Sequence, residues 1–118
     1  MSYKPLAGKD DFDEVFNNST LSINSKNFSA LILITNSKLR LGMILPKKNI
    51  KLAVQRNYLK RIIRKLSIDV FEESKVSLVV VSKKRILDFK KDILRKEIKT
   101  LFLNLTKKMN EENNYIFN

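Results

Sequence analysis

The segment from Gln55 to Lys65 holds the residues whose types and spacing are best suited to chemistry with a partner. On a helix, where successive residues are about 100° apart, its polar side chains fall on one half of the circumference and apolar ones such as Leu59 and Ile63 on the other. Cations so close together repel one another, so the pattern favours an anionic partner, with a polyphosphate backbone as the natural candidate. The alternative is an ordinary surface helix with solvated lysines. The polar half consists of Arg56, Asn57, Lys60, Arg61, Arg64 and Lys65.

The charge distribution points in the same direction. The 118 residues carry a formal net charge of +12. From Val15 to Ile68 there is no Asp or Glu, whereas the same stretch contains eleven Lys and Arg residues. Because an ordinary surface mixes both signs, a long acid-free block indicates a surface for nucleic acid.

Other classes of function are disfavoured by what the chain lacks. It contains neither Cys nor His, and it has no P-loop, dinucleotide fingerprint or Ser/His/Asp set. The acidic cluster of Asp10, Asp11, Asp13 and Glu14 is explained more simply by helix capping than by Mg²⁺ binding. We therefore expect no cofactor on the protein side chains and no catalytic residue. The absence of a secretory signal or membrane-spanning run predicts a cytoplasmic protein.

The hydrophobic pattern predicts the elements that must position these residues. Helices and strands do not alternate strictly, and their order, α-β-β-β-α-β-α, indicates an α+β fold with a small mixed sheet backed by helices. We expect one domain over residues 1–118, with residues 1–9 and 110–118 loosely ordered. The predicted segments are helices over about residues 10–16, 52–71 and 89–108, and strands over residues 21–24, 28–35, 39–45 and 76–81.

Two further basic clusters follow the ends of predicted strands. Lys47 and Lys48 come after the third strand, and Lys83, Lys84 and Arg85 come after the fourth. If these two strands are neighbours, the clusters line one edge of the sheet and form an electrostatic groove for a single nucleic-acid strand. The alternative is that they are ordinary loop lysines.

Two aromatic residues of the first helix have two possible roles. Phe12 and Phe16 stand four positions apart, as on one face of a helix. Such residues usually anchor a core, but they also serve as stacking platforms for unpaired bases.

Three segments, in the same order along the chain, resemble the bacterial ribonuclease P protein component. From Asp11 to Phe16 the sequence is similar to the family's D-F-x-x-V-F opening. From Leu39 to Lys65, L-R-L-G-M-I-L-P-K-K-N-I-K-L-A-V-Q-R-N-Y-L-K-R-I-I-R-K resembles its glycine-bearing strand, double lysine and "RNR" helix. From Val79 to Lys84, V-V-V-S-K-K resembles its last strand and basic end.

The chain departs from the family pattern at three places. Tyr58 stands at the third position of the "RNR" motif, where the family has arginine. Leu31 replaces a common aromatic residue, and Pro5-Leu6 replaces the customary R-L near the start. One phosphate contact on the helix and one aromatic residue of the sheet are therefore in question.

The resemblance implies a fold and a set of contacts. The fold is expected to be a ribosomal-protein-like two-layer unit with a left-handed β-α-β crossover, against the usual handedness. The basic helix, through Arg56, Asn57, Lys60, Arg61, Arg64 and Lys65, is expected to contact the catalytic RNA. A cleft between the first helix and the sheet is expected to hold the 5′ leader of precursor tRNA through Phe12, Phe16, Phe28, Lys47, Lys48, Lys83 and Lys84.

It also implies a division of labour. Removal of the leader is expected to be carried out by Mg²⁺ ions held by the RNA, and the protein is expected to act as a monomer within the complex. A structural ribosomal RNA-binding protein is the alternative, since it explains the charge equally well. A further alternative is an independent nuclease that uses the acidic residues of the first helix.

Overall fold

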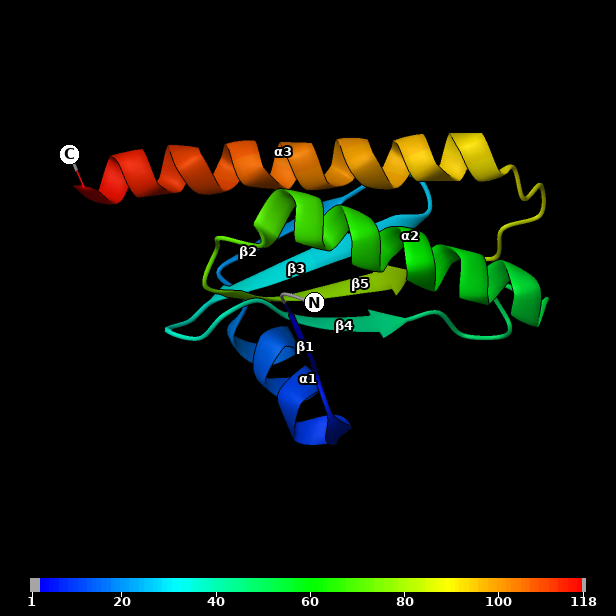
Figure 1. Ribbon diagram of the computed structural model, residues 1–118, viewed down its shortest axis with the longest axis horizontal. Helices are drawn as coiled ribbons and strands as arrows, with labels where there is room; N and C mark the ends of the chain where they lie inside the picture. Colours follow the sequence, from blue (N-terminus) through cyan, green and yellow to red (C-terminus); the bar gives the residue numbers. More distant parts are fainter. Residues whose placement is uncertain (1–2, 118) are drawn as a thin grey trace.

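The computed structural model describes the backbone of residues 3–117 and the side chains of residues 3–111. Its strands form one five-stranded sheet in the order β1-β4-β5-β3-β2 (Figure 1). The elements are β1 (Lys4–Pro5), α1 (Gly8–Asn18), β2 (Leu21–Asn24), β3 (Phe28–Ile34), β4 (Arg40–Ile44), α2 (Ala53–Phe71), β5 (Val76–Ser82) and α3 (Lys91–Phe117).

The sheet is mixed, as predicted. Strands β4 and β5 are parallel neighbours joined through α2, whereas β3 is antiparallel to both β5 and β2. The short β1 runs parallel to β4 at the edge. The left-handed sense expected for the β4-α2-β5 crossover stays a prediction.

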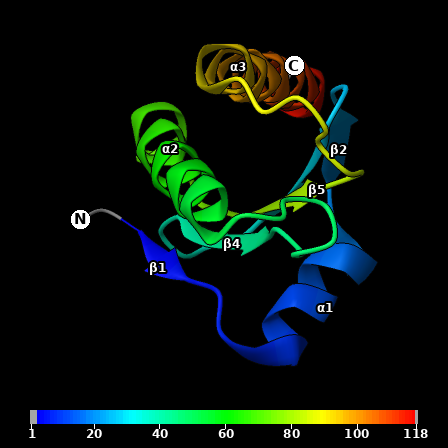
Figure 2. The same cartoon turned by 90° about the vertical axis from the view of Figure 1, so that its right-hand side faces the viewer.

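The two faces of the sheet carry different layers. Strand alternation sends Phe28 and Ile32 of β3 to one face and Leu31 and Leu33 to the other. The first face is covered by α2 and α3, and the second by α1 (Figure 2). The predicted sheet-and-helix layers are thus present, with α1 as a smaller cover on the far side.

The α2 helix follows its hydrophobic pattern closely. Its residues Leu59, Ile63 and Leu66 recur at helical spacing and are buried, together with Phe71 at its end. The Phe71 ring meets the ring of Phe102 from α3 edge to face, with 5.6 Å between ring centroids. This packing fixes the rotation of α2 and therefore decides which of its side chains face solvent.

The N-terminal segment is more ordered than the sequence predicts. Lys4 N–H donates to Leu39 O and Leu6 N–H to Leu41 O, both at 2.9 Å, and the Leu6 side chain is buried. The prediction that residues 1–9 are loosely ordered is therefore wrong for residues 4–9, because the backbone finds partners on the edge of β4. Met1 and Ser2 lie outside the described residues.

The ends of the first and last helices also differ from the predicted ones. Helix α1 begins at Gly8, whose φ of +76° is a left-handed conformation suited to glycine, rather than at Asp10. Helix α3 begins at Lys91 and continues to Phe117 instead of ending near residue 108. The predicted loose order of residues 110–118 stays a prediction, since side chains after Glu111 lie outside the described ones.

Candidate nucleic-acid interface

The predicted basic row lies on the solvent side of α2. Arg61, Lys65 and Asn57 are exposed, whereas Arg56, Lys60 and Arg64 are half-buried along the flanks of the helix. We call these six residues the α2 row. The apolar stripe on the opposite side of the same helix is buried in the core, so the α2 row must face solvent.

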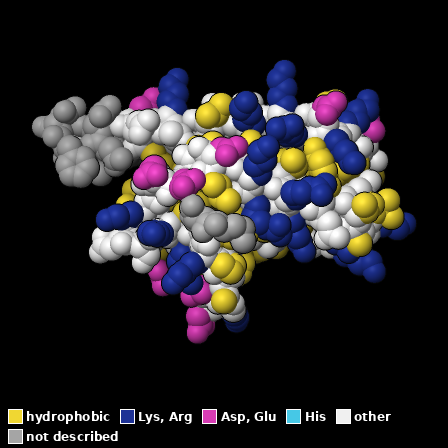
Figure 3. All heavy atoms as spheres, in the orientation of Figure 1, with side chains coloured by type: hydrophobic (Ala, Val, Ile, Leu, Met, Phe, Trp, Pro, Cys, Tyr) yellow, Lys and Arg dark blue, Asp and Glu magenta, His cyan; other side chains and the backbone are white. Residues whose placement is uncertain are grey.

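No carboxylate neutralises the α2 row within residues 3–111. The ion pairs there join Arg40 to Asp11 at 2.6 Å and Lys90 to Asp88 at 3.5 Å, and neither involves α2. In the space-filling view, Lys and Arg side chains gather over α2 and the adjoining part of α3 (Figure 3). The row is therefore an open cationic surface, as the sequence predicts.

Arg56 differs from the rest of the row. Its Nη1 donates to the carbonyl oxygens of Ile50 at 2.8 Å and Lys51 at 3.0 Å. These carbonyls belong to the loop between β4 and α2, so Arg56 also orders that loop. Its other guanidinium nitrogens have no hydrogen-bond partner among the described residues, which leaves them available to a phosphate.

The second predicted region forms at the carboxyl ends of β4 and β5. Ile44 and Val81 are register partners there, so the chain segments with Lys47, Lys48 and Lys84 leave the sheet at the same edge. The strand adjacency assumed from the sequence is confirmed. The two loops are also joined directly, since Asn49 Nδ2 donates to Ser82 O at 3.0 Å and Ile86 N–H donates to Asn49 O at 2.9 Å.

The lysines of this edge are not equivalent. The side chains of Lys47, Lys48 and Lys84 are exposed, and their ammonium groups have no hydrogen-bond or ion-pair partner among the described residues. Lys83 is exposed too, but its Nζ donates to the carbonyl oxygen of Ser25 at 2.9 Å. Lys83 thus holds the turn between β2 and β3 and has less freedom to meet a ligand than its neighbour.

The α1 side of the sheet supplies an apolar surface beside this edge. Val15 is buried beneath α1, Phe12 is half-buried, and Phe16 is 42% exposed. Next to the helix, half-buried side chains form a partly open floor on the sheet: Leu31, Ile44 and Val81. We call this floor, with Phe12, Phe16 and the lysines of the edge, the α1 surface.

The assignment of Phe28 to this cleft is wrong. Phe28 is fully buried, and it lies in the core between the sheet and helices α2 and α3. The reason is strand parity: Phe28 and Leu31 are three residues apart on β3 and therefore point to opposite faces. The run F-S-A-L-I-L-I-T is apolar on both sides, so its composition does not reveal which face belongs to α1.

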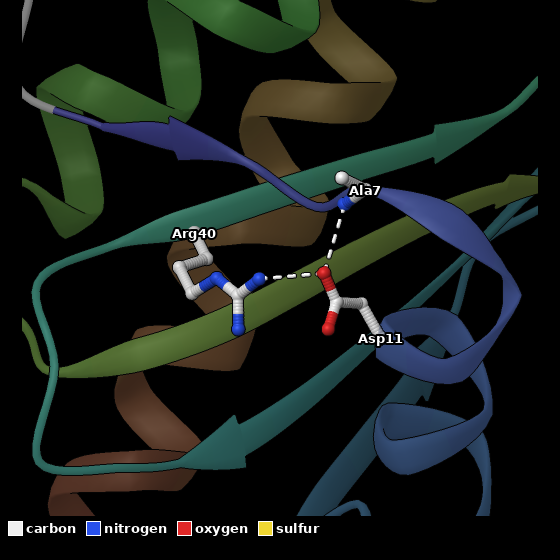
Figure 4. A network of polar contacts seen from close by, with 3 residues as sticks. All are labelled: Ala7, Asp11 and Arg40. Carbon is white, nitrogen blue, oxygen red and sulfur yellow. Dashed lines mark hydrogen bonds and ion pairs between the residues drawn. The ribbon is translucent and has the colours of Figure 1, made fainter.

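The acidic residue of the opening motif has a structural partner. Asp11 Oδ2 accepts hydrogen bonds from Ala7 N–H at 3.0 Å and from Arg40 Nη2 at 2.6 Å (Figure 4). The bond from Ala7 N–H, helped by the Arg40 guanidinium, holds the pKa of Asp11 below its ordinary value, although partial desolvation opposes this. No group of three or more acidic residues suited to a metal ion occurs in the described part of the chain.

Two residues that organise the α1 surface have no signal in the sequence. Glu97 of α3 accepts hydrogen bonds from Asn27 N–H and Asn27 Nδ2, both at 2.7 Å, and from the hydroxyl of Ser25. Asn49 joins the two basic loops. Both partnerships span long sequence separations, so only the folded chain brings the groups together.

None of the described helices is long and apolar enough to cross a membrane.

The chain is similar in sequence to known ribonuclease P protein components. The chain is 47% identical over 57 residues to a ribonuclease P protein component from Marinobacter nauticus, covering 46% of this chain and 42% of that protein. It is 38% identical over 82 residues to one from Pseudomonas fluorescens, covering 65% of this chain and 59% of that protein. The chain therefore aligns with less than two thirds of the length of these relatives.

Solved structures share the fold. The RNase P protein of Staphylococcus aureus superposes with a TM-score of 0.73 at 20% identity, covering 87% of this chain and 94% of that one. The RNase P protein of Thermotoga maritima gives 0.63 at 22% identity, covering 78% and 88%. Residues 2–106 match the sequence model of the family described as Ribonuclease P, so this chain belongs to the ribonuclease P protein family.

Proposed function

We propose that this chain is the protein subunit of the ribonuclease P ribonucleoprotein and assists endonucleolytic removal of the 5′ leader from precursor tRNA. The observation that carries the proposal is the α2 row. Its cations lie open along one helix, without a carboxylate partner in residues 3–111, in a chain that belongs to this family. An RNA backbone supplies the missing negative charge.

The α2 row is assigned to the catalytic RNA. Arg61 and Arg64 offer planar guanidinium groups that match two phosphate oxygens at once, whereas Lys60 and Lys65 act as point charges. Asn57, exposed near the start of the row, is suited to a sugar or base-edge contact. Counterions released from the RNA drive this binding, which makes it sensitive to salt.

The α1 surface is assigned to the leader. A single strand offers both unstacked bases and phosphates, and this surface pairs exposed Phe16 and an apolar floor with Lys47, Lys48 and Lys84. Because the lysines follow the ends of the strands that carry Ile44 and Val81 of the floor, an RNA strand lying there meets aromatic and cationic groups together. Binding of the leader favours precursor over mature tRNA.

Bond cleavage is assigned to the RNA subunit with its Mg²⁺ ions. The chain has no His or Cys, and the carboxylate of Asp11 is engaged by Ala7 and Arg40, so its own groups do not fit a metal-held hydrolytic centre. The contribution of the protein is to screen two polyanions from each other and to orient the substrate. We further propose that it works in the cytoplasm as a monomer within the complex and binds no cofactor.

Reconstitution tests the proposal. Adding the protein to the catalytic RNA and a labelled precursor tRNA at low magnesium is expected to restore cleavage at the mature 5′ end. A variant with Arg61→Gln and Lys65→Gln is expected to restore much less, whereas a variant with Lys96→Gln and Lys107→Gln, an equal charge change at exposed sites of α3, is the control. If the unaltered protein leaves the rate unchanged, the proposal is wrong, and co-purification with ribosomal subunits would then favour the ribosomal alternative.

A second test addresses the leader alone. Phe16→Ala removes an exposed aromatic side chain from the α1 surface and is expected to weaken binding of precursor tRNA more than binding of mature tRNA. Binding of both to the reconstituted complex is compared at one salt concentration. Equal losses for the two RNAs would remove the assignment of the leader to this surface.

A further inference from the structure

Tyr58 lies where α2 meets the start of α3, and its ring gathers groups from both helices. The ring meets Phe89 edge to face, with centroids 6.2 Å apart, and its hydroxyl donates to Lys91 O at 3.4 Å. The ammonium of Lys91 lies 5.1 Å from the ring centroid, and the guanidinium carbon of Arg61 lies 5.9 Å from it. Both distances are within the range of a cation–π interaction.

The ring thus has two positive charges within 5.9 Å of its centroid, one from each helix. An aromatic ring attracts a cation electrostatically but does not cancel its charge. Within residues 3–111 neither Arg61 nor Lys91 forms an ion pair, whereas the adjacent Lys90 is paired with Asp88. Lys91 also stands in the first turn of α3, at the positive end of the helix dipole, where a cation is unfavourable. An anion that contacts both side chains would make this arrangement favourable.

Resting on the proposed function, we infer that Lys91 and Arg61 together bind a phosphate of the RNA backbone and that Tyr58 positions them. The catalytic RNA is the occupant that the observations favour, because Arg61 is part of the α2 row already assigned to it. The interface then extends from α2 onto the first turn of α3. Tyr58 contributes no charge, but it fixes the spacing of two phosphate-binding side chains.

The salt dependence of binding to the catalytic RNA of ribonuclease P tests this inference. Lys91→Gln is expected to weaken binding several-fold and to lower the slope of log affinity against log salt by about 0.7 to 0.9, the value of one phosphate contact. Lys91→Arg is expected to restore the slope. Lys96→Gln is the matched control: it removes the same charge from an exposed site on the same helix, beside Asn24 and Ser25 of the β2 side.

Variants of Tyr58 separate positioning from charge. Tyr58→Phe keeps the ring and is expected to bind within about twofold of the parent, whereas Tyr58→Leu removes the cation–π contacts and is expected to bind several-fold more weakly. Thermal unfolding of each variant reports whether the helix contact itself is lost. A parent-like salt slope for Lys91→Gln alongside a lowered slope for Arg61→Gln overturns this inference alone. Parent-like slopes for both overturn the assignment of the α2 row as well.

Discussion

The α2 row and the α1 surface are built in opposite ways. The α2 row comes from a single helix, and among its cations only Arg56 donates hydrogen bonds within the described protein. The α1 surface is assembled from α1, three strands and two loops, and part of its charge is already engaged, as in Lys83 with Ser25. A surface on one element needs only that element's rotation to be fixed, whereas a composite surface depends on contacts between distant segments.

Because of this difference, a substitution beneath α1 is expected to give the largest effect that disturbs the α1 surface without disturbing the α2 row. A Cβ added at Gly42 would lie 2.5 Å from Phe12 Cε1 and 2.9 Å from Leu6 Cδ1. Gly42→Val is therefore expected to push α1 away from the sheet and to lower the free energy of unfolding by about 2 to 3 kcal/mol. Urea unfolding measures the loss.

Gly42→Ala is the graded control for that experiment, with a smaller loss expected. In both variants the salt slope for the catalytic RNA should stay at the parent value, since α2 packs on the other face of the sheet. A slope that falls together with stability would show that the two regions are not independent.

The next largest effect is expected at Glu97, which joins α3 to the turn between β2 and β3. Glu97→Ala leaves the N–H of largely buried Asn27 without its acceptor and is expected to cost about 2 kcal/mol. Binding of precursor tRNA should weaken as well, because the hydrogen bond to Ser25 O in this turn positions Lys83 at the basic edge. Glu111→Ala, at an exposed site of the same helix, is the control. Equal stability of the two variants would contradict the role given to Glu97.

Within the α2 row, Arg56 and Arg61 offer a finer contrast. Each change to Ala is expected to lower the salt slope for RNA binding by about 0.7 to 0.9. Arg56→Ala is also expected to cost about 1 kcal/mol of stability, because the carbonyls of Ile50 and Lys51 lose a charged donor. Thermal unfolding and titrations at several salt concentrations measure both quantities. Unchanged slopes in both variants would rule out α2 as the contact surface.

The smallest effect is expected from pH at Asp11. Its pKa is lowered in the folded chain, so its contribution to stability is present above the ordinary carboxyl pKa and is lost as pH falls through the lowered value. Asp11→Asn removes this contribution at neutral pH. The difference in melting temperature between the parent and Asp11→Asn should therefore shrink toward zero in acid. A difference that grows as the pH falls would mean that the sign is wrong.

Local patterns predicted most of the elements and the α2 row. The spacing of Leu59, Ile63 and Leu66 identifies the buried stripe of α2 and so its basic face. The prediction failed where a residue's position depends on partners elsewhere. The family resemblance implies Phe28 on the α1 side, and the evenly apolar strand does not reveal that its parity puts this residue on the other face. Strand β1 is missed because its two residues pair only with a distant edge.

The functional residues can also be separated into those that the sequence predicts and those that only the fold brings together. The exposed cations of α2 follow from the sequence, whereas the links made by Asn49 and Glu97 bridge segments far apart in the chain. Tyr58 is intermediate: its sequence position marks it as a departure from the family, but its contacts with Phe89 and Lys91 are visible only in the folded chain.

The pairing of Lys4–Pro5 with β4 has a consequence for the whole α1 surface. This two-residue strand and the buried Leu6 that follows it attach the chain to one edge of the sheet just before α1 begins. Since Val15 is the single buried side chain of α1, the helix has little packing of its own to fix its angle. Any change that separates residues 4–6 from β4 is expected to reorient Phe12 and Phe16 and so to alter recognition of the leader. Binding of the catalytic RNA by α2 is expected to be unaffected.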